Sequence, residues 1–199
     1  MIVDEIKERF VEDTNYNMQD PYPLHWHPSL PENRDKHYGM LHFMREKFKD
    51  KRTLEIGYRW AGRFFHNSKV LDLYDPRPDI DYRIDICNAK IIPDNSFDLI
   101  NCISVLEHIP KFWKAAEEIQ RILAKDGILI CGIPAVWPYH PFCGNQNMGG
   151  DYWRVTHEGL VSLFDKLTKV TVYYVPAART KEEPMTFGWG CCYIGVKNE

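Results

Sequence analysis

Three acidic residues lie where short apolar runs end, at positions suited to holding a nucleoside. Glu55 belongs to the run TLEIG, Asp75 ends KVLDLYD twenty residues later, and Asp85 follows in YRIDIC. The carboxyl ends of parallel strands share one edge of a sheet, where an acid about 20 residues past the first turn accepts ribose hydroxyls. Three acids at successive strand ends favour a neutral or cationic nucleoside. A pyrophosphate would instead require a G-x-G-x-x-G turn, and the sequence has none.

The apolar pattern predicts the elements that would position these acids. Continuous apolar runs are typical of strands covered on both faces, and apolar residues at helical spacing indicate the helices. Alternating strands and helices predict an α/β fold with a mostly parallel sheet, and the short last connection predicts an antiparallel final pair. The expected strands are 52–56, 69–74, 97–103, 127–133, 170–175 and 191–196, and the expected helices are 3–12, 35–49, 110–127 and 157–166.

The length of the chain predicts one compact domain. Its 199 residues are enough for one well-packed core and too few for two large ones. Residues 1–51 contain two helix-like segments around a stretch rich in proline and aromatic residues, and we expect them to form an N-terminal helical cap. Residues 52–199 carry the alternating pattern and would form a Rossmann-like domain.

Composition excludes several classes of protein. A net charge of -3 gives no bulk attraction to nucleic acid or to an anionic membrane. The most apolar stretch, GILICGIPAVWPY, is interrupted by Pro134 and Pro138 and is too short to cross a bilayer. The N-terminal residues lack the apolar region of a signal peptide. We therefore expect a soluble, cytoplasmic protein that binds neither nucleic acid nor membrane.

The cysteines and the paired histidines point to no metal site. The six cysteines show no C-x-x-C spacing, and Cys102 and Cys131 lie inside apolar runs, as buried free thiols of a reducing compartment do. His25 and His27 have a spacing that also occurs in metal sites. Without a cluster of partners in the sequence, they are expected to be surface or packing residues.

One stretch of the sequence resembles a known enzyme family. LEIG, an acid at the end of the second strand, and then PDNSFDLI, VLEHI and L-x-x-x-G-I-L-I resemble class I S-adenosylmethionine-dependent methyltransferases, in particular those that modify small metabolites. The likeness covers about residues 53 to 165. The two last strands also fit the reversed final hairpin of that fold. DYWRVTHEGLVSLF resembles members linked to sugar or glycan modification.

The resemblance implies a role for each residue that matches the first two motifs. Glu55 would organise the methionine amino end of S-adenosylmethionine, and Gly57 would let the backbone approach the cofactor. Asp75 would accept both ribose hydroxyls. A simple turn role for Asp75 remains open, because an aspartate before a proline often starts a turn.

Later motifs supply the rest of the implied cofactor site. Asp85 would accept from the adenine amino group, and Ile86 would pack on the ring. Ile103 and Ser104 would line the sulfonium end of the cofactor.

The glycine turn departs from the family pattern. The family has an acid followed by three alternating glycines, whereas this chain has Arg59 and Ala61 at the second and third of these positions. A non-glycine residue there has to avoid positive φ. We expect a turn that holds the cofactor more loosely or through added contacts from Tyr58 and Arg59, followed by a helix reduced to a turn.

Methyl transfer from a sulfonium needs an aligned acceptor and no metal. A hydroxyl acceptor must also lose a proton, and the candidate bases are His108 and His140 at the carboxyl edge of the sheet. Both could instead be structural, and His108 with the preceding glutamate could cap the next helix. Asp151, Tyr152 and Arg154 would shape the acceptor pocket.

The sequence therefore predicts an S-adenosylmethionine-dependent transferase that methylates a small polar acceptor, with O-methylation of a sugar or glycan precursor preferred. The alternative is a catalytically degenerate relative that binds the cofactor or a partner. A nucleic-acid methyltransferase is disfavoured, since no Asn/Asp-Pro-Pro-Tyr motif follows the strand at 97–103. A nicotinamide-dependent oxidoreductase is the third interpretation.

Overall fold

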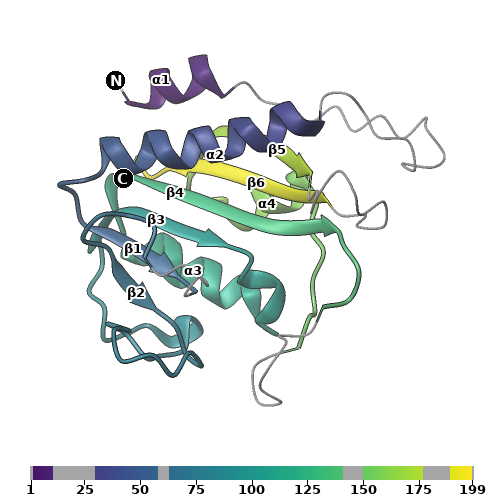
Figure 1. Ribbon diagram of the computed structural model, residues 1–199. Coiled ribbons are helices and arrows are strands. Elements are labelled where there is room, and N and C mark those ends of the chain that lie inside the picture. Colours follow the sequence, from purple (N-terminus) through teal and green to yellow (C-terminus); the bar gives the residue numbers. More distant parts are fainter. Residues whose placement is uncertain (1, 11–29, 58–62, 141–149, 177–188, 199) are drawn as a thin grey trace.

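A computed structural model describes residues 2–10, 30–57, 63–140, 150–176 and 189–198, and it contains a six-stranded sheet with helices on both faces (Figure 1). The strands are β1 (Thr53–Ile56), β2 (Lys69–Leu71), β3 (Phe97–Ile103), β4 (Leu123–Val136), β5 (Thr168–Pro176) and β6 (Trp189–Val196). The helices are α1 (Ile2–Arg9), α2 (Leu30–Lys47), α3 (Phe112–Ile122) and α4 (His157–Leu163), with short 3-10 helices η1 (Ile86–Asn88) and η2 (Leu106–His108).

The strand order is β2-β1-β3-β4-β6-β5. Strands β2, β1, β3 and β4 run parallel, and β6 pairs antiparallel with both β4 and β5. This arrangement confirms the predicted α/β class and the antiparallel final hairpin. The four parallel strands consequently end at one edge of the sheet, called here the carboxyl edge.

Each face of the sheet carries its own apolar core. On one face, α1 and α2 bury Ile6, Met40 and Met44 against β3, β4, β5 and β6. On the other face, α3 and α4 bury Ala116, Ile119 and Leu160 against the same sheet (Figure 1). Continuous apolar strands follow from this double coverage, because neither side of β1 or of the centre of β4 meets water. The division into a cap at 1–51 and a domain at 52–199 stays a prediction.

Among the element boundaries that differ from those expected are the end of α3 and the end of β2. Helix α3 ends at Ile122 and not at Gly127, because Leu123 already pairs with Phe97 at the start of β4. A Cβ on Gly127 would lie 2.7 Å from the carbonyl oxygen of Ala124, so this glycine allows a close backbone approach within the strand and does not end the helix. Strand β2 ends at Leu71, three residues before the predicted end at Tyr74.

The connection between β1 and β2 contains no helix in its described part. Residues 63–68 contain one turn and no helix, which agrees with the expected reduction of this helix to a turn. The glycine turn at 58–62, with Tyr58 and Arg59, lies outside the described residues. His25 and His27 lie outside them as well. Within the described ranges, every helix is too short or too polar to cross a membrane.

Candidate functional site

Gly57 joins the first two parallel strands at the carboxyl edge. Its N–H donates to the carbonyl oxygen of Leu71 at 2.9 Å, and its φ of +80° belongs to the left-handed region that favours glycine. A Cβ at this position would lie 2.4 Å from Cγ2 of Val105, just past β3. The glycine therefore lets β1 turn while in contact with the end of β3.

Glu55 organises the chain that returns from this turn. Its side chain is buried and accepts the backbone N–H groups of Phe64 and Phe65 at 3.0–3.1 Å and the hydroxyl of Ser68 at 2.6 Å. The carboxylate thus satisfies three donors of an otherwise irregular segment. Its predicted contact with the amino end of a cofactor stays a prediction.

Two aspartates follow β2, and only the second was expected to bind the cofactor. Asp72 is the first residue after the strand, and its Oδ1 accepts the N–H groups of Tyr74 and Asp75 at 2.9 Å. Asp75 lies four residues past the strand, where Arg77 donates to its carboxylate through the backbone and the guanidinium. This hydrogen bonding by Arg77 lowers the pKa of Asp75. Asp72 is therefore the acid placed directly at the carboxyl edge.

Asp85 and Ile86 begin the 3-10 helix η1. The carboxylate of Asp85 accepts the N–H of Cys87 at 2.8 Å, so it caps η1 while its side chain remains exposed. Ile86 is buried in the core beneath α3. At the end of β3, Ser104 has a φ of +57° and donates its N–H to Gly132 of β4, next to the partly buried Ile103. The structure therefore brings Ser104 to the carboxyl edge.

A glutamate that was expected to be at most a helix cap lies buried beside the two candidate histidines. Glu107 has no exposed surface, and neither oxygen of its carboxyl group has a hydrogen-bond partner among the described residues. Its Oε1 lies 3.8 Å from Nε2 of His108 and 4.0 Å from Nε2 of His140. The cap interpretation is wrong, since α3 is preceded by Lys111 and receives no side-chain cap. Glu107, His108 and His140 are called here the Glu107 cluster.

The histidines of the cluster come from segments 32 positions apart in the chain. Their rings approach edge to face, with centroids 5.2 Å apart. His108 follows β3 in η2, and His140 follows β4, so the parallel strands bring both to the carboxyl edge, as predicted. Whether either acts as a base stays a prediction.

Residues 150–155 pack against the cluster and hold it in place. Gly150 accepts from Nδ1 of His108 at 2.9 Å, and Tyr152 donates its N–H to the carbonyl of Glu107 at 2.7 Å. Asp151 accepts the N–H of His140 at 2.8 Å and pairs with both terminal nitrogens of Arg154 at 2.6 Å. Asp151 and Arg154 thus bind each other, whereas half of the Tyr152 side chain is exposed. The acceptor-pocket role of all three stays a prediction.

The two carboxyl groups near the histidines have pKa values shifted in opposite directions. Burial raises the pKa of Glu107 to about 8, with the negative charge of Asp151 acting in the same direction. Hydrogen bonding from Arg154 lowers the pKa of Asp151 to about 2. Burial also lowers the pKa of His108. At neutral pH the site consequently holds a mostly neutral Glu107 beside an ionised Asp151, a contrast typical of functional sites.

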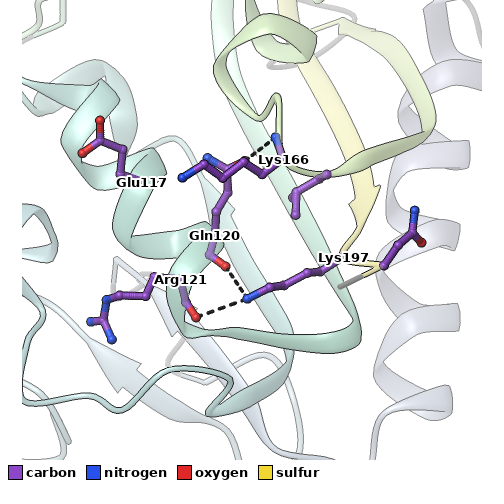
Figure 2. A pocket seen from close by; sticks show the side chains of 7 residues that line it. Glu117, Gln120, Arg121, Lys166 and Lys197 are labelled. Atoms are coloured by element: carbon purple, nitrogen blue, oxygen red, sulfur yellow. Dashed lines mark hydrogen bonds between the residues drawn. The ribbon is translucent and has the colours of Figure 1, made fainter.

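A cavity of about 630 Å³ lies at the opposite edge of the sheet, where β4 begins (Figure 2). Lys197 donates there to the carbonyl oxygens of Gln120, Arg121 and Leu123, the residues that end α3. A cation at these carbonyls caps the helix and complements its dipole. Burial lowers the pKa of Lys197. This cavity is structural in character and is remote from the carboxyl edge.

Comparison with known proteins links the chain to one family. Residues 67–131 match the family described as "Methyltransferase domain". This stretch runs from the turn before β2 to the middle of β4 and includes Asp72, Asp85, Ser104 and Glu107. No curated protein sequence matches the chain.

Solved structures with low sequence identity share the fold. A protein from Listeria monocytogenes, provisionally described as an S-adenosylmethionine-dependent methyltransferase, superposes with a TM-score of 0.59 at 13% identity, over 81% of this chain and 96% of that one. The 1,6-didemethyltoxoflavin-N1-methyltransferase of Burkholderia thailandensis, solved with S-adenosylhomocysteine, gives 0.57 at 14%, over 86% and 84%. The N-methyltransferase NodS of Bradyrhizobium japonicum, also with S-adenosylhomocysteine, gives 0.52 at 16%, over 99% and 98%.

Proposed function

We propose that the chain is a class I S-adenosylmethionine-dependent methyltransferase, as the resemblance implied, and that it transfers the methyl group to a small polar acceptor. The observation that carries this proposal is the convergence of the methyltransferase-domain match and the carboxyl edge. Within residues 67–131, the acids after β2 and the turn at Ser104 follow parallel strands that end at one edge, where open parallel sheets bind ligands, and the cap of η1 lies in the same stretch.

S-adenosylmethionine is the methyl donor in this proposal. Asp72 accepts the ribose hydroxyls, with Asp75 as the alternative that its pairing with Arg77 disfavours. Asp85 accepts from the adenine amino group, and Ile86 packs below the ring. Two relatives of this fold bind S-adenosylhomocysteine, which supports the same cofactor here.

The remaining part of the cofactor site lies at the ends of β1 and β3. Glu55 and Gly57 form the turn that meets the methionine end, with Tyr58 adding a contact. Ile103 and Ser104 line the sulfonium.

A hydroxyl is the preferred acceptor, because the Glu107 cluster offers two imidazole groups that can accept a proton, and His108 lies four residues past Ser104. His108 or His140 would take the proton that an alcohol loses on methylation. Two relatives are named N-methyltransferases, so nitrogen is the competing acceptor atom. Asp151, Tyr152 and Arg154 would border the acceptor, and a sugar or glycan precursor fits such a polar surface.

The competing function is a module that binds cofactor or partner without turnover. It is favoured by the altered turn after Gly57, where Arg59 and Ala61 stand in place of glycines. Such a module would bind S-adenosylmethionine and transfer nothing. The cytoplasmic location and the absence of nucleic-acid and membrane partners stay predictions.

Calorimetry with S-adenosylhomocysteine and with NAD tests the cofactor. We expect the first to bind and NAD not to bind, and S-adenosylhomocysteine at 100 times its Kd to add about 2.7 kcal/mol to the free energy of unfolding. Absence of binding by S-adenosylhomocysteine would contradict the proposal. Transfer of a labelled methyl group to a panel of sugars, nucleotide sugars, phenols and amines then separates oxygen from nitrogen acceptors.

The roles of the histidines have their own measurement. Replacing a base lowers turnover and leaves cofactor affinity unchanged, because the base acts only on the proton lost during transfer. His108→Ala and His140→Ala are compared with His66→Ala, which changes an exposed histidine far along the chain. Equal transfer by all three variants would remove both histidines from the chemistry.

A further inference from the structure

We propose that Glu107, His108 and His140 bind one divalent transition-metal ion at the carboxyl edge of the sheet. One carboxylate oxygen and one nitrogen from each ring lie within 4.8 Å of one another. The three side chains come from η2 and from the segment after β4. They are therefore positioned by two neighbouring strands of the sheet.

The carboxyl group of Glu107 is the first observation that points to a cation. It is fully buried, and among the described residues its two oxygens accept no hydrogen bond. A buried carboxyl without a partner is costly, and such a group in a native fold calls for an unseen ion or water. The nearby guanidinium of Arg154 does not meet this need, because Asp151 binds both of its terminal nitrogens at 2.6 Å.

Hydrogen bonds at the other ring nitrogens indicate which nitrogen of each histidine faces Glu107. Nδ1 of His108 lies 2.9 Å from the carbonyl of Gly150, which can only accept, so Nδ1 carries the proton and Nε2 carries the lone pair. Nδ1 of His140 lies 3.0 Å from the carbonyl of Pro138 and 3.1 Å from Asp151.

Arg154 also approaches Nδ1 of His140, at 3.3 Å. The two protons of this Nη2 atom are already directed to Asp151 at 2.6 Å and to Pro138 at 3.0 Å. Nδ1 of His140 is thus a donor, and its Nε2 has the lone pair. Metal-binding histidines are oriented in the same way, with the second nitrogen bound to a carbonyl or a carboxylate.

The distances suit a small ion after a slight closure. Zinc binds nitrogen and oxygen at about 2.0–2.2 Å, so two ligand atoms on a tetrahedral ion are about 3.4 Å apart. Oε1 of Glu107 is 3.8 Å from Nε2 of His108 and 4.0 Å from Nε2 of His140. Both pairs therefore have to close by about half an ångström, and the ligand nitrogens of the two rings, which lie within 4.8 Å of each other, have to close by at most about 1.4 Å.

The ligand set indicates the class of metal. Two imidazoles and one carboxylate suit Zn²⁺, Mn²⁺, Fe²⁺ or Co²⁺, whereas Mg²⁺ and Ca²⁺ prefer oxygen ligands alone. Three protein ligands leave at least one position for a further oxygen. If the proposed methyl transfer holds, that position would take the acceptor hydroxyl and lower its pKa, and the two histidines would then act as metal ligands in place of a base. This role rests on the proposed function, whereas the binding of the metal does not.

Calorimetry with Zn²⁺ on protein freed of metal by a chelator tests the site. We expect one ion per chain, with affinity weakened at least about 100-fold in Glu107→Gln and in His140→Gln, since loss of an outer-sphere partner alone costs 10–100-fold. His66→Gln is the matched control and should bind as the wild type does. Absent binding, or binding that Glu107→Gln leaves unchanged, would overturn the proposal.

Two further measurements separate this result from misfolding and from binding at cysteines. Glu107→Gln removes a buried ionisable group, so without metal it should unfold at the wild-type temperature or above, while Zn²⁺ should raise the Tm of the wild type only. Bound Co²⁺ should show a spectrum without thiolate charge-transfer absorption. A thiolate spectrum would place the ion at cysteines and refute the site.

Metal binding and cofactor binding fail independently. Zn²⁺ binding without any affinity for S-adenosylhomocysteine would refute the methyltransferase proposal and support the metal site. Affinity for S-adenosylhomocysteine in a protein that binds no Zn²⁺ would do the reverse.

Discussion

Gly57 and Val105 are in such close contact that the glycine has no room for a side chain. A Cβ on Gly57 would lie 2.4 Å from Cγ2 of Val105, and the φ of +80° would be strained in any other residue. Gly57→Ala should lower the free energy of unfolding by about 2–4 kcal/mol, combining backbone strain with overpacking. Denaturant unfolding measures the change. Wild-type stability in Gly57→Ala would show that the turn moves freely away from β3.

Gly39→Ala is the control for this substitution. Gly39 lies inside α2, where an added Cβ meets nothing within 4 Å. Alanine in a helix interior is favoured over glycine, so this variant should gain about 0.5–1 kcal/mol in the same unfolding experiment.

Asp72 and Asp75 differ in their expected effects on cofactor binding. Asp72→Asn keeps the Oδ1 acceptor of the turn and removes one acceptor for the ribose. It should therefore weaken the binding of S-adenosylhomocysteine about tenfold, or by about 1.4 kcal/mol. Asp75→Asn should change the affinity less, because Arg77 already occupies that carboxylate. Calorimetry gives both values, and the opposite order would assign the ribose to Asp75.

Arg154 should matter to stability through the carboxylate that it neutralises. Asp151 has no exposed side-chain surface, so Arg154→Ala would leave a buried carboxylate whose remaining partners among the described residues are the backbone N–H and Nδ1 of His140. We expect a loss of about 3 kcal/mol in the free energy of unfolding. The exposed pair of Lys47 and Glu5 is the control, and Lys47→Ala should have a much smaller effect. Similar losses in both variants would contradict this interpretation.

The ion pair of Asp98 with Arg52 should make the free energy of unfolding fall at acid pH. Arg52 donates to Asp98 through its backbone N–H and its guanidinium, and this lowers the pKa of Asp98. A folded pKa below the unfolded value of about 3.9 adds stability that is complete above that value and is lost as the pH falls through the folded pKa.

The variant Asp98→Asn measures this contribution. With Arg52 more than half exposed, wild type should exceed the variant by about 0.5–1 kcal/mol at neutral pH. The difference should shrink as the pH falls below about 4. A constant difference down to about pH 2 would attribute the effect to packing.

Elements with a strong local signal could be predicted from the sequence. The run Phe97–Ile103 was expected at the residues where β3 lies, because a strand buried on both faces is apolar throughout. The end of β2 could not be predicted in the same way. KVLDLYD offers two acids, and only pairing with β1 decides that the strand stops at Leu71. The end of α3 is likewise decided by the pairing of Leu123 with Phe97.

The candidate site, too, could be predicted from the sequence only in part. The proximity of His108 and His140 could be predicted, because both follow parallel strands and such strands end at the same edge of the sheet. The burial of Glu107 depends on contacts with residues 150–155, and the letters LEH give no sign of it. A signal was available in its position four residues past a buried strand.

The position of β6 between β4 and β5 has a consequence for how the chain folds during its synthesis on the ribosome. Among the described strands, β5 pairs with β6 alone, yet β5 is synthesised first. Until β6 arrives, both β4 and β5 present unpaired edges, the feature from which wrong intermolecular pairing starts. Insertion of β6 between these two strands is therefore a late step of folding, because it has to wait for the end of the chain. Slow translation would prolong the exposure of the two edges, and a chaperone bound during that interval would protect them from wrong pairing.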